Sequence, residues 1–183
     1  RRAICRAWLN FYQHNSQDLS ISDTDAWGEF DATLTTSNLP MPANDEGIAL
    51  CWYYGRAEYG AGQVEYALQL FTLGLQLCQK HTNWTLEAHL HHDIAILEAH
   101  QGETDKAETR LRQQALPLYE KLGDVRSKTV TMGRIADILQ ARGQLDEALN
   151  IRENHQLPVY EKLGDVRSLL IGALGISVTV GGV

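Results

Sequence analysis

A short run of histidine and aspartate residues near the middle of the chain has the residue types and spacing to bind a divalent metal. The run is His89–Asp93, with the sequence HLHHD. If this segment is helical, His89, His92 and Asp93 lie on one face, because residues three and four apart are neighbours on a helix. Imidazole and carboxylate groups placed together are suitable ligands for a transition metal.

The metal-binding hypothesis needs more ligands than this run supplies. His92-Asp93 is also the pair used by HD-type phosphohydrolases, which this sequence resembles only in those two residues. Such enzymes require further His and Asp ligands from a fitting helical array. We therefore predict no catalytic residue, no metal and no cofactor, and we interpret the histidines as a polar, partly exposed helix face. An HD-like metallohydrolase stays as an alternative, and it predicts bound metal that His92→Ala loses.

Other catalytic signatures are missing from the sequence. Gly60-Ala61-Gly62 lacks the third glycine and the Lys-Ser/Thr of a phosphate-binding loop, and no HExxH, CxxC or GxSxG occurs. The three cysteines are odd in number and widely spaced, as is typical of a reducing compartment. We expect a cytoplasmic location, with two of them packed as small hydrophobic side chains. The cysteines are Cys5, Cys51 and Cys78, and Cys51 and Cys78 are the two expected to be buried.

Composition excludes several classes of partner. The net charge of −7 argues against nonspecific binding to nucleic acid, which depends on clustered Lys and Arg. The charges are interleaved, so no basic block faces an acidic lipid surface. No apolar run approaches the ~20 residues that span a bilayer. The first residues, 1–5, include no initiator Met, which indicates a fragment of a longer protein.

The elements that position these residues follow from an internal repeat. Leu116–Ser127 (LPLYEKLGDVRS) returns 41 positions later as Leu157–Ser168 (LPVYEKLGDVRS), with eleven of twelve residues identical. The same offset relates Ala95 to Ala136, and an offset of 40 relates Ala67 to Ala107. A fixed period of this size indicates a stacked array of supersecondary units.

Each unit is predicted to contain two helices. Apolar residues between 64 and 80 follow helical spacing on two faces, as expected for a helix between neighbours. A capping side chain is expected before each following first helix, and a glycine in the left-handed conformation before two of those caps. The expected caps are Asn83, Asp124 and Asp165; the expected glycines are Gly123 and Gly164, with Gly62, Gly102 and Gly143 at the turn inside each hairpin.

These features resemble the tetratricopeptide repeat (TPR) family. That pattern has small residues where two helices cross, followed by an aromatic or aliphatic residue. Position by position, Gly55, Ala95 and Ala136 match the first small site, Ala67, Ala107 and Ala148 the second, and Phe71 and Leu111 the large apolar site. The third unit breaks the pattern with Arg152, and Cys51 and His91 replace the family's tryptophan. The unit is about seven residues longer than the usual roughly 34, so the chain resembles the longer subclass of about 40 residues.

The resemblance covers about residues 47–170 and implies an all-α, right-handed superhelical solenoid of antiparallel helical hairpins. HEAT-like helical repeats, with a similar period, are the structural alternative. We assign 1–46 to an N-terminal helical capping segment and linker and 47–183 to the repeat array. The units are about 47–82, 83–123 and 124–164, with a partial unit at 165–183.

The family also implies where a partner would bind, because the first helix of each hairpin lines the concave groove. Aromatic and arginine side chains there are the usual anchors of protein interfaces. The implied partner-binding residues are Trp52, Arg56, Tyr59, His89, His92, Ile96, His100, Val130, Asp137 and Gln140. Alternatively, Trp52 and Tyr59 pack against the N-terminal segment. His89, His92 and His100 would make binding pH-dependent near the unperturbed histidine pKa of about 6.5.

We therefore predict a non-enzymatic scaffold that binds a peptide or protein partner. One alternative is the sensor region of a larger bacterial signalling ATPase, which a Walker motif elsewhere in the gene would indicate. Another is a self-association module, because the chain ends in an apolar stretch and its repeats are nearly identical, so that copies could stack as a homo-oligomer.

Overall fold

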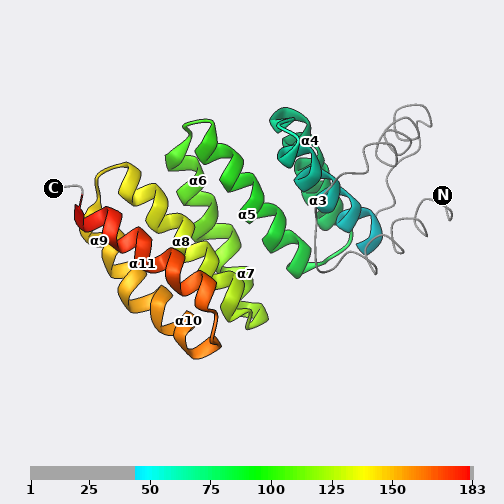
Figure 1. The fold of residues 1–183 in the computed structure, drawn as a ribbon. Coiled ribbons are helices and arrows are strands. Elements are labelled where there is room, and N and C mark those ends of the chain that lie inside the picture. Colours follow the sequence, from blue (N-terminus) through cyan, green and yellow to red (C-terminus); the bar gives the residue numbers. More distant parts are fainter. Residues whose placement is uncertain (1–43, 182–183) are drawn as a thin grey trace.

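The structure, a computed structural model, describes residues 44–181, and every regular element in that range is a helix. The predicted all-α solenoid of helical hairpins is confirmed there (Figure 1). The first hairpin consists of α3 (Asp45–Gly60) and α4 (Val64–Lys80). The N-terminal helices and Cys5 predicted above lie outside the described residues.

The second and third hairpins each have a long second helix that contains a π-helical turn. α5 (Trp84–His100) pairs with α6 (Thr104–Arg110), η1 (Leu111–Ala115) and α7 (Leu116–Leu122). α8 (Val125–Ala141) pairs with α9 (Leu145–Ile151), η2 (Arg152–Gln156) and α10 (Leu157–Leu163). α11 (Val166–Gly181) then packs against the third hairpin.

The helix boundaries follow from the predicted capping chemistry. The Asn83 side chain accepts a hydrogen bond from the Leu86 backbone N–H at 2.9 Å, and Asp124 accepts one from Ser127 at the same distance. Asp165 caps α11 in the same way through Ser168. Gly123 and Gly164 end α7 and α10 with φ of 68° and 65°, the left-handed conformation that glycine adopts without steric cost. These predictions are confirmed.

The π turns lie immediately before the prolines of the duplicated segment. Pro117 and Pro158 have no backbone N–H, and proline inside an α-helix normally breaks or kinks it. Here the turn before each proline widens, so that the Leu116 N–H bonds to the Leu111 carbonyl, five residues back. The wider turn allows the long second helix to continue through the proline.

The two larger hydrophobic cores of the array both include side chains of α5. The first joins α3 and α4 to Leu90, Ile94 and Leu97 of α5, with Phe71 at its centre and 1% exposed. The second joins Ala95 of α5 to η1, α8 and α9. Neighbouring hairpins therefore share buried side chains, as in other repeat proteins where each unit contacts its neighbours.

Cys51 and Cys78 belong to the first core, as predicted, and neither forms a disulfide. Burial raises the pKa of the Cys51 thiol to about 12 and that of Cys78 to about 11, so both are protonated at neutral pH. Between residues 44 and 181, no helix has the length and hydrophobicity needed to cross a membrane.

Candidate functional site

Four side chains from α3 and α5 form a compact cluster, which we call the Trp52 cluster: Trp52, Arg56, His89 and Asp93. The Trp52 and His89 rings are stacked, with centroids 4.6 Å apart and planes 8° from parallel. The indole N–H of Trp52 donates to Asp93 Oδ2 at 2.7 Å. The Arg56 guanidinium lies 5.4 Å from the Trp52 ring centroid, and its Nε is 3.9 Å from the same carboxylate oxygen.

The histidines of α5 extend these contacts to α7 of the same hairpin and to α8 of the third. His89 Nδ1 lies 2.9 Å from the Tyr119 hydroxyl of α7, and His92 Nδ1 lies 2.9 Å from Thr131 Oγ1 of α8. The Thr131 hydroxyl already donates to the Ser127 carbonyl, so in the second pair His92 must donate from Nδ1. His92 is therefore the Nδ1–H tautomer when it is neutral.

Burial determines the charge on these groups. It lowers the pKa of His92 to about 4, and Arg134, His89 and Arg56 act in the same direction. Burial also lowers the pKa of His89, against the opposing charge of Asp124. The expectation that both titrate near 6.5 is therefore wrong, because the buried imidazoles lose the hydration that favours the charged form. Burial raises the pKa of Asp93, while Arg56 and the Trp52 N–H oppose that rise.

Other predicted residues form separate pairs on the same helices. The Tyr59 hydroxyl lies 2.6 Å from His100 Nδ1, which joins α3 to α5 a second time. Asp137 and Gln140 both accept hydrogen bonds from Arg152 Nη2, at 2.7 and 3.0 Å. Ile96 and Val130 are half-buried. The predicted set thus separates into the Trp52 cluster, the Tyr59–His100 pair, the His92–Thr131 contact and the Arg152 group.

The three side chains considered above as metal ligands point to different partners. His89 contacts Tyr119, His92 contacts Thr131, and Asp93 accepts from Trp52. Within the part of the chain that the structure describes, no group of three His, Cys, Asp or Glu side chains is placed to hold a metal ion.

Sequence reasoning missed the partners that organise this face. Asp93 follows Trp52 by 41 residues, the repeat period, so its contact with the neighbouring hairpin could have been found from the offset. Arg152 stands out in the sequence as a break in the apolar pattern. No sequence signal identifies Tyr119 or Thr131, because their contacts depend on how α7 and α8 pack against α5.

One shallow pocket of about 410 Å³ lies elsewhere, against α5, α6 and η1. Its lining includes His91 and Arg110, and Arg110 makes two hydrogen bonds to the buried Glu98 carboxylate. Burial and the Arg110 charge lower the pKa of His91 to about 4. The charges at this pocket therefore already have partners within the chain.

No protein-family model and no curated protein matches the sequence. Solved structures do match. A Podosopora anserina protein described as a kinesin light chain with nearly identical TPR-like repeats aligns with a TM-score of 0.65 and 19% identity, over 97% of this chain and 84% of that chain. Its Q17M variant gives 0.67 with the same identity and coverage. The helical hairpins, their caps and this likeness together show that the chain has the fold of the TPR-like repeat proteins.

Proposed function

We propose that this chain is a non-enzymatic scaffold that binds a peptide or protein segment through the side chains of its first helices. The observation that carries the proposal is the Trp52 cluster. It holds an exposed arginine, whose side chain is 57% exposed, against a stacked aromatic pair and a nearly buried carboxylate. Such an arginine is partly ordered before binding, which reduces the entropy lost when a partner docks.

The surroundings of the cluster support a surface for a polypeptide rather than for a reaction. Arg56, His100 and Asp137 are exposed on the three successive first helices α3, α5 and α8. They offer a cation, an aromatic ring and an anion to an extended partner. Arginine and aromatic groups are enriched among the residues that dominate binding energy in interfaces. The buried, free Cys51 and Cys78 are compatible with a reducing compartment such as the cytoplasm.

The experiment compares proteins captured from source-cell lysate by wild type and two variants, quantified by mass spectrometry. The binding variant, Arg56→Ala/His100→Ala, changes exposed side chains and leaves the Trp52–His89 stack in place. The control, Arg112→Ala/Gln113→Ala, changes exposed side chains of η1. Circular dichroism checks that all three are folded.

A partner retained by wild type and by the control but lost by the binding variant supports the proposal. A partner captured equally by all three places recognition on another surface and contradicts it. If no partner is captured, the proposed scaffold function fails.

A further inference from the structure

The connections between successive hairpins expose large apolar side chains at equivalent positions of the repeat. Trp84, Val125 and Val166 are the first residues of α5, α8 and α11. Leu122 and Leu163 are the last residues of α7 and α10. We call this set the edge stripe, and its exposed fractions are Trp84 42%, Leu122 37%, Val125 53%, Leu163 51% and Val166 65%.

The turn between hairpins does not itself require apolar residues beside it. The turn between α7 and α8 depends on Gly123 for its left-handed backbone and on the Asp124 side chain for the cap. Its backbone hydrogen bonds run from Gly123 and Asp124 to carbonyls of α7. The side chains of Leu122 and Val125 take no part in the left-handed turn or in the cap. Exposed apolar groups that recur in this way mark an interaction surface more often than isolated ones do.

The members of the stripe lie along one edge of the array. The connections between α4 and α5, α7 and α8, and α10 and α11 all lie toward the lower edge of the molecule in Figure 1. Contacts join neighbouring connections: Lys121 Nζ lies 3.1 Å from the Trp84 ring centroid, and Arg126 Nη2 donates to Asp165 Oδ2 at 2.7 Å. The stripe therefore runs across three hairpin junctions and shares no residue with the Trp52 cluster.

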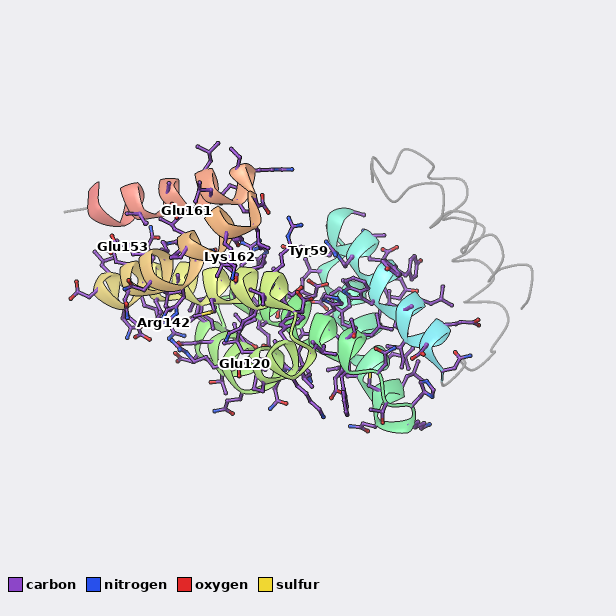
Figure 2. The ribbon with its side chains drawn as sticks, turned by 90° about the horizontal axis from the view of Figure 1, so that it is seen from below. Tyr59, Glu120, Arg142, Glu153, Glu161 and Lys162 are labelled. Carbon is purple, nitrogen blue, oxygen red and sulfur yellow. The ribbon has the colours of Figure 1, made fainter. Side chains whose placement is uncertain are left out.

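Charges beside the stripe indicate which partner it fits. Each exposed leucine follows a Glu-Lys pair, Glu120-Lys121 in one unit and Glu161-Lys162 in the next, and all four side chains are exposed. Figure 2 views this edge from below and labels Glu120, Glu161 and Lys162. A partner of uniform charge would meet like charge at half of these positions. A second copy brings the same pairs, so each carboxylate can face an ammonium group.

We propose that the edge stripe is the surface through which two copies of this chain associate side by side. In a two-fold, isologous dimer the same surface of each copy faces the other. The two duplicated connections have nearly the same sequence, so either of them offers a partner copy the same side chains. The leucine and valine side chains exclude water at the centre, and the Glu-Lys pairs fix the alignment. The proposal rests on different side chains from the scaffold function and does not depend on it.

The first test measures the mass of the full chain in solution by sedimentation at several concentrations. We expect a wild-type dimer, and we expect Leu122→Gln/Leu163→Gln to raise its dissociation constant at least about a hundredfold. Ile171→Gln is the control, because it changes an α11 side chain that is 60% exposed, lacks a flanking Glu-Lys pair and does not share a helix face with Val166. This control should remain a dimer.

The second test exchanges charges. Glu120→Lys/Glu161→Lys and Lys121→Glu/Lys162→Glu should each be monomeric, because like charges then face each other across the interface. Mixed in equal amounts, the two variants should form a heterodimer. Circular dichroism confirms folding, since Glu120 also pairs with Lys128 and Lys121 with Trp84.

The proposal is overturned if wild type is a monomer, if the leucine variant remains a dimer, or if the α11 control dissociates instead. It is also overturned if the charge-exchanged chains do not associate when mixed. Arg56→Ala/His100→Ala should leave the dimer intact, so a failure of the scaffold proposal and a failure of this one give different results.

Discussion

At the scale of single residues, Asp93 shows how the first two hairpins are held in a defined arrangement. Its side chain is 17% exposed and lies between an indole N–H and a guanidinium. A carboxylate that has lost most of its contact with water needs hydrogen-bond donors from the protein, because leaving a buried acceptor without a partner costs free energy. The interaction of α3 with α5 therefore relies on a few directed contacts as well as on apolar packing.

Trp52→Phe removes the donor and keeps an aromatic ring against His89. We expect the free energy of unfolding at pH 7 to fall by about 1–3 kcal/mol, because the Asp93 carboxylate loses its hydrogen bond. Urea denaturation measures this change. Trp84→Phe on the exposed edge is the control and should change stability by less than about 0.5 kcal/mol. Equal losses in the two variants would show that the indole N–H has no special role.

His92 predicts a dependence of stability on pH. Its pKa is about 4 in the folded chain and about 6.5 when unfolded, so the unfolded chain binds more protons between these values. The contribution of neutral His92 to the free energy of unfolding is therefore fully present above pH 6.5. It is lost as the pH falls toward 4, which lowers the free energy of unfolding by an amount of order 1–3 kcal/mol. His89 and His91 act in the same direction. The pKa of Asp93 is raised, so the folded chain binds more protons than the unfolded chain at pH values above 3.8. In that range Asp93 makes stability fall as the pH rises, which opposes the effect of the histidines.

Denaturation curves at intervals between pH 4 and 7 measure this dependence. His92→Gln, which cannot become charged, should reduce the slope of stability against pH. An unchanged slope in that variant would mean that His92 is not responsible for the effect.

At the scale of elements, the parts of the fold that the sequence predicted are those controlled by local chemistry. Asn83 and Asp124 are caps because their side chains reach their own helix, three residues away. The contacts of His92 were not predictable, because Thr131 lies on another helix and its approach depends on the packing angle. The π turns also went unpredicted, although Pro117 and Pro158 indicate where a helix must adjust.

Two glycines allow a matched test of helix termination. Gly123 has φ of 68° and open space around it, so Gly123→Ala should cost about 1 kcal/mol through the backbone alone. Gly60, at the end of α3, also has open space but no positive φ, so Gly60→Ala should be neutral or stabilising by up to about 1 kcal/mol. Thermal or urea unfolding distinguishes them. Equal effects would mean that the left-handed turn carries no strain.

Arg152 occupies the position of Leu111 in the preceding hairpin, and α11 accommodates it with a glycine. A Cβ on Gly175 would lie 2.5 Å from Arg152 Nη1 and 2.6 Å from Cζ. The Arg152 side chain is 5% exposed and its Nη2 is hydrogen-bonded to Asp137 and Gln140, so it cannot move aside freely. We therefore expect Gly175→Ala to lose about 1–3 kcal/mol of stability. In an Arg152→Leu background that loss should shrink, because leucine is shorter. Urea denaturation of the four proteins in a double-mutant cycle measures the coupling, and additive effects would contradict the prediction.

At the scale of the whole molecule, the two cores predict that damage stays local. Phe71→Ala should cost about 3–5 kcal/mol and reduce hydrogen-exchange protection in α3 and α4 more than in α8 and α9. Leu111→Ala, in the second core, is the matched control and should give the reverse pattern. Uniform loss of protection in both variants would show that the array unfolds as one cooperative unit.

The near-identity of Leu116–Ser127 and Leu157–Ser168 has a consequence for the length of the array. Inserting or removing 41 residues between equivalent points of the two segments leaves the repeat pattern intact. Because Arg126 of one unit already contacts Asp165 of the next, an inserted unit meets the same chemistry at both of its junctions. The array can therefore lengthen or shorten by a whole hairpin without a new kind of interface.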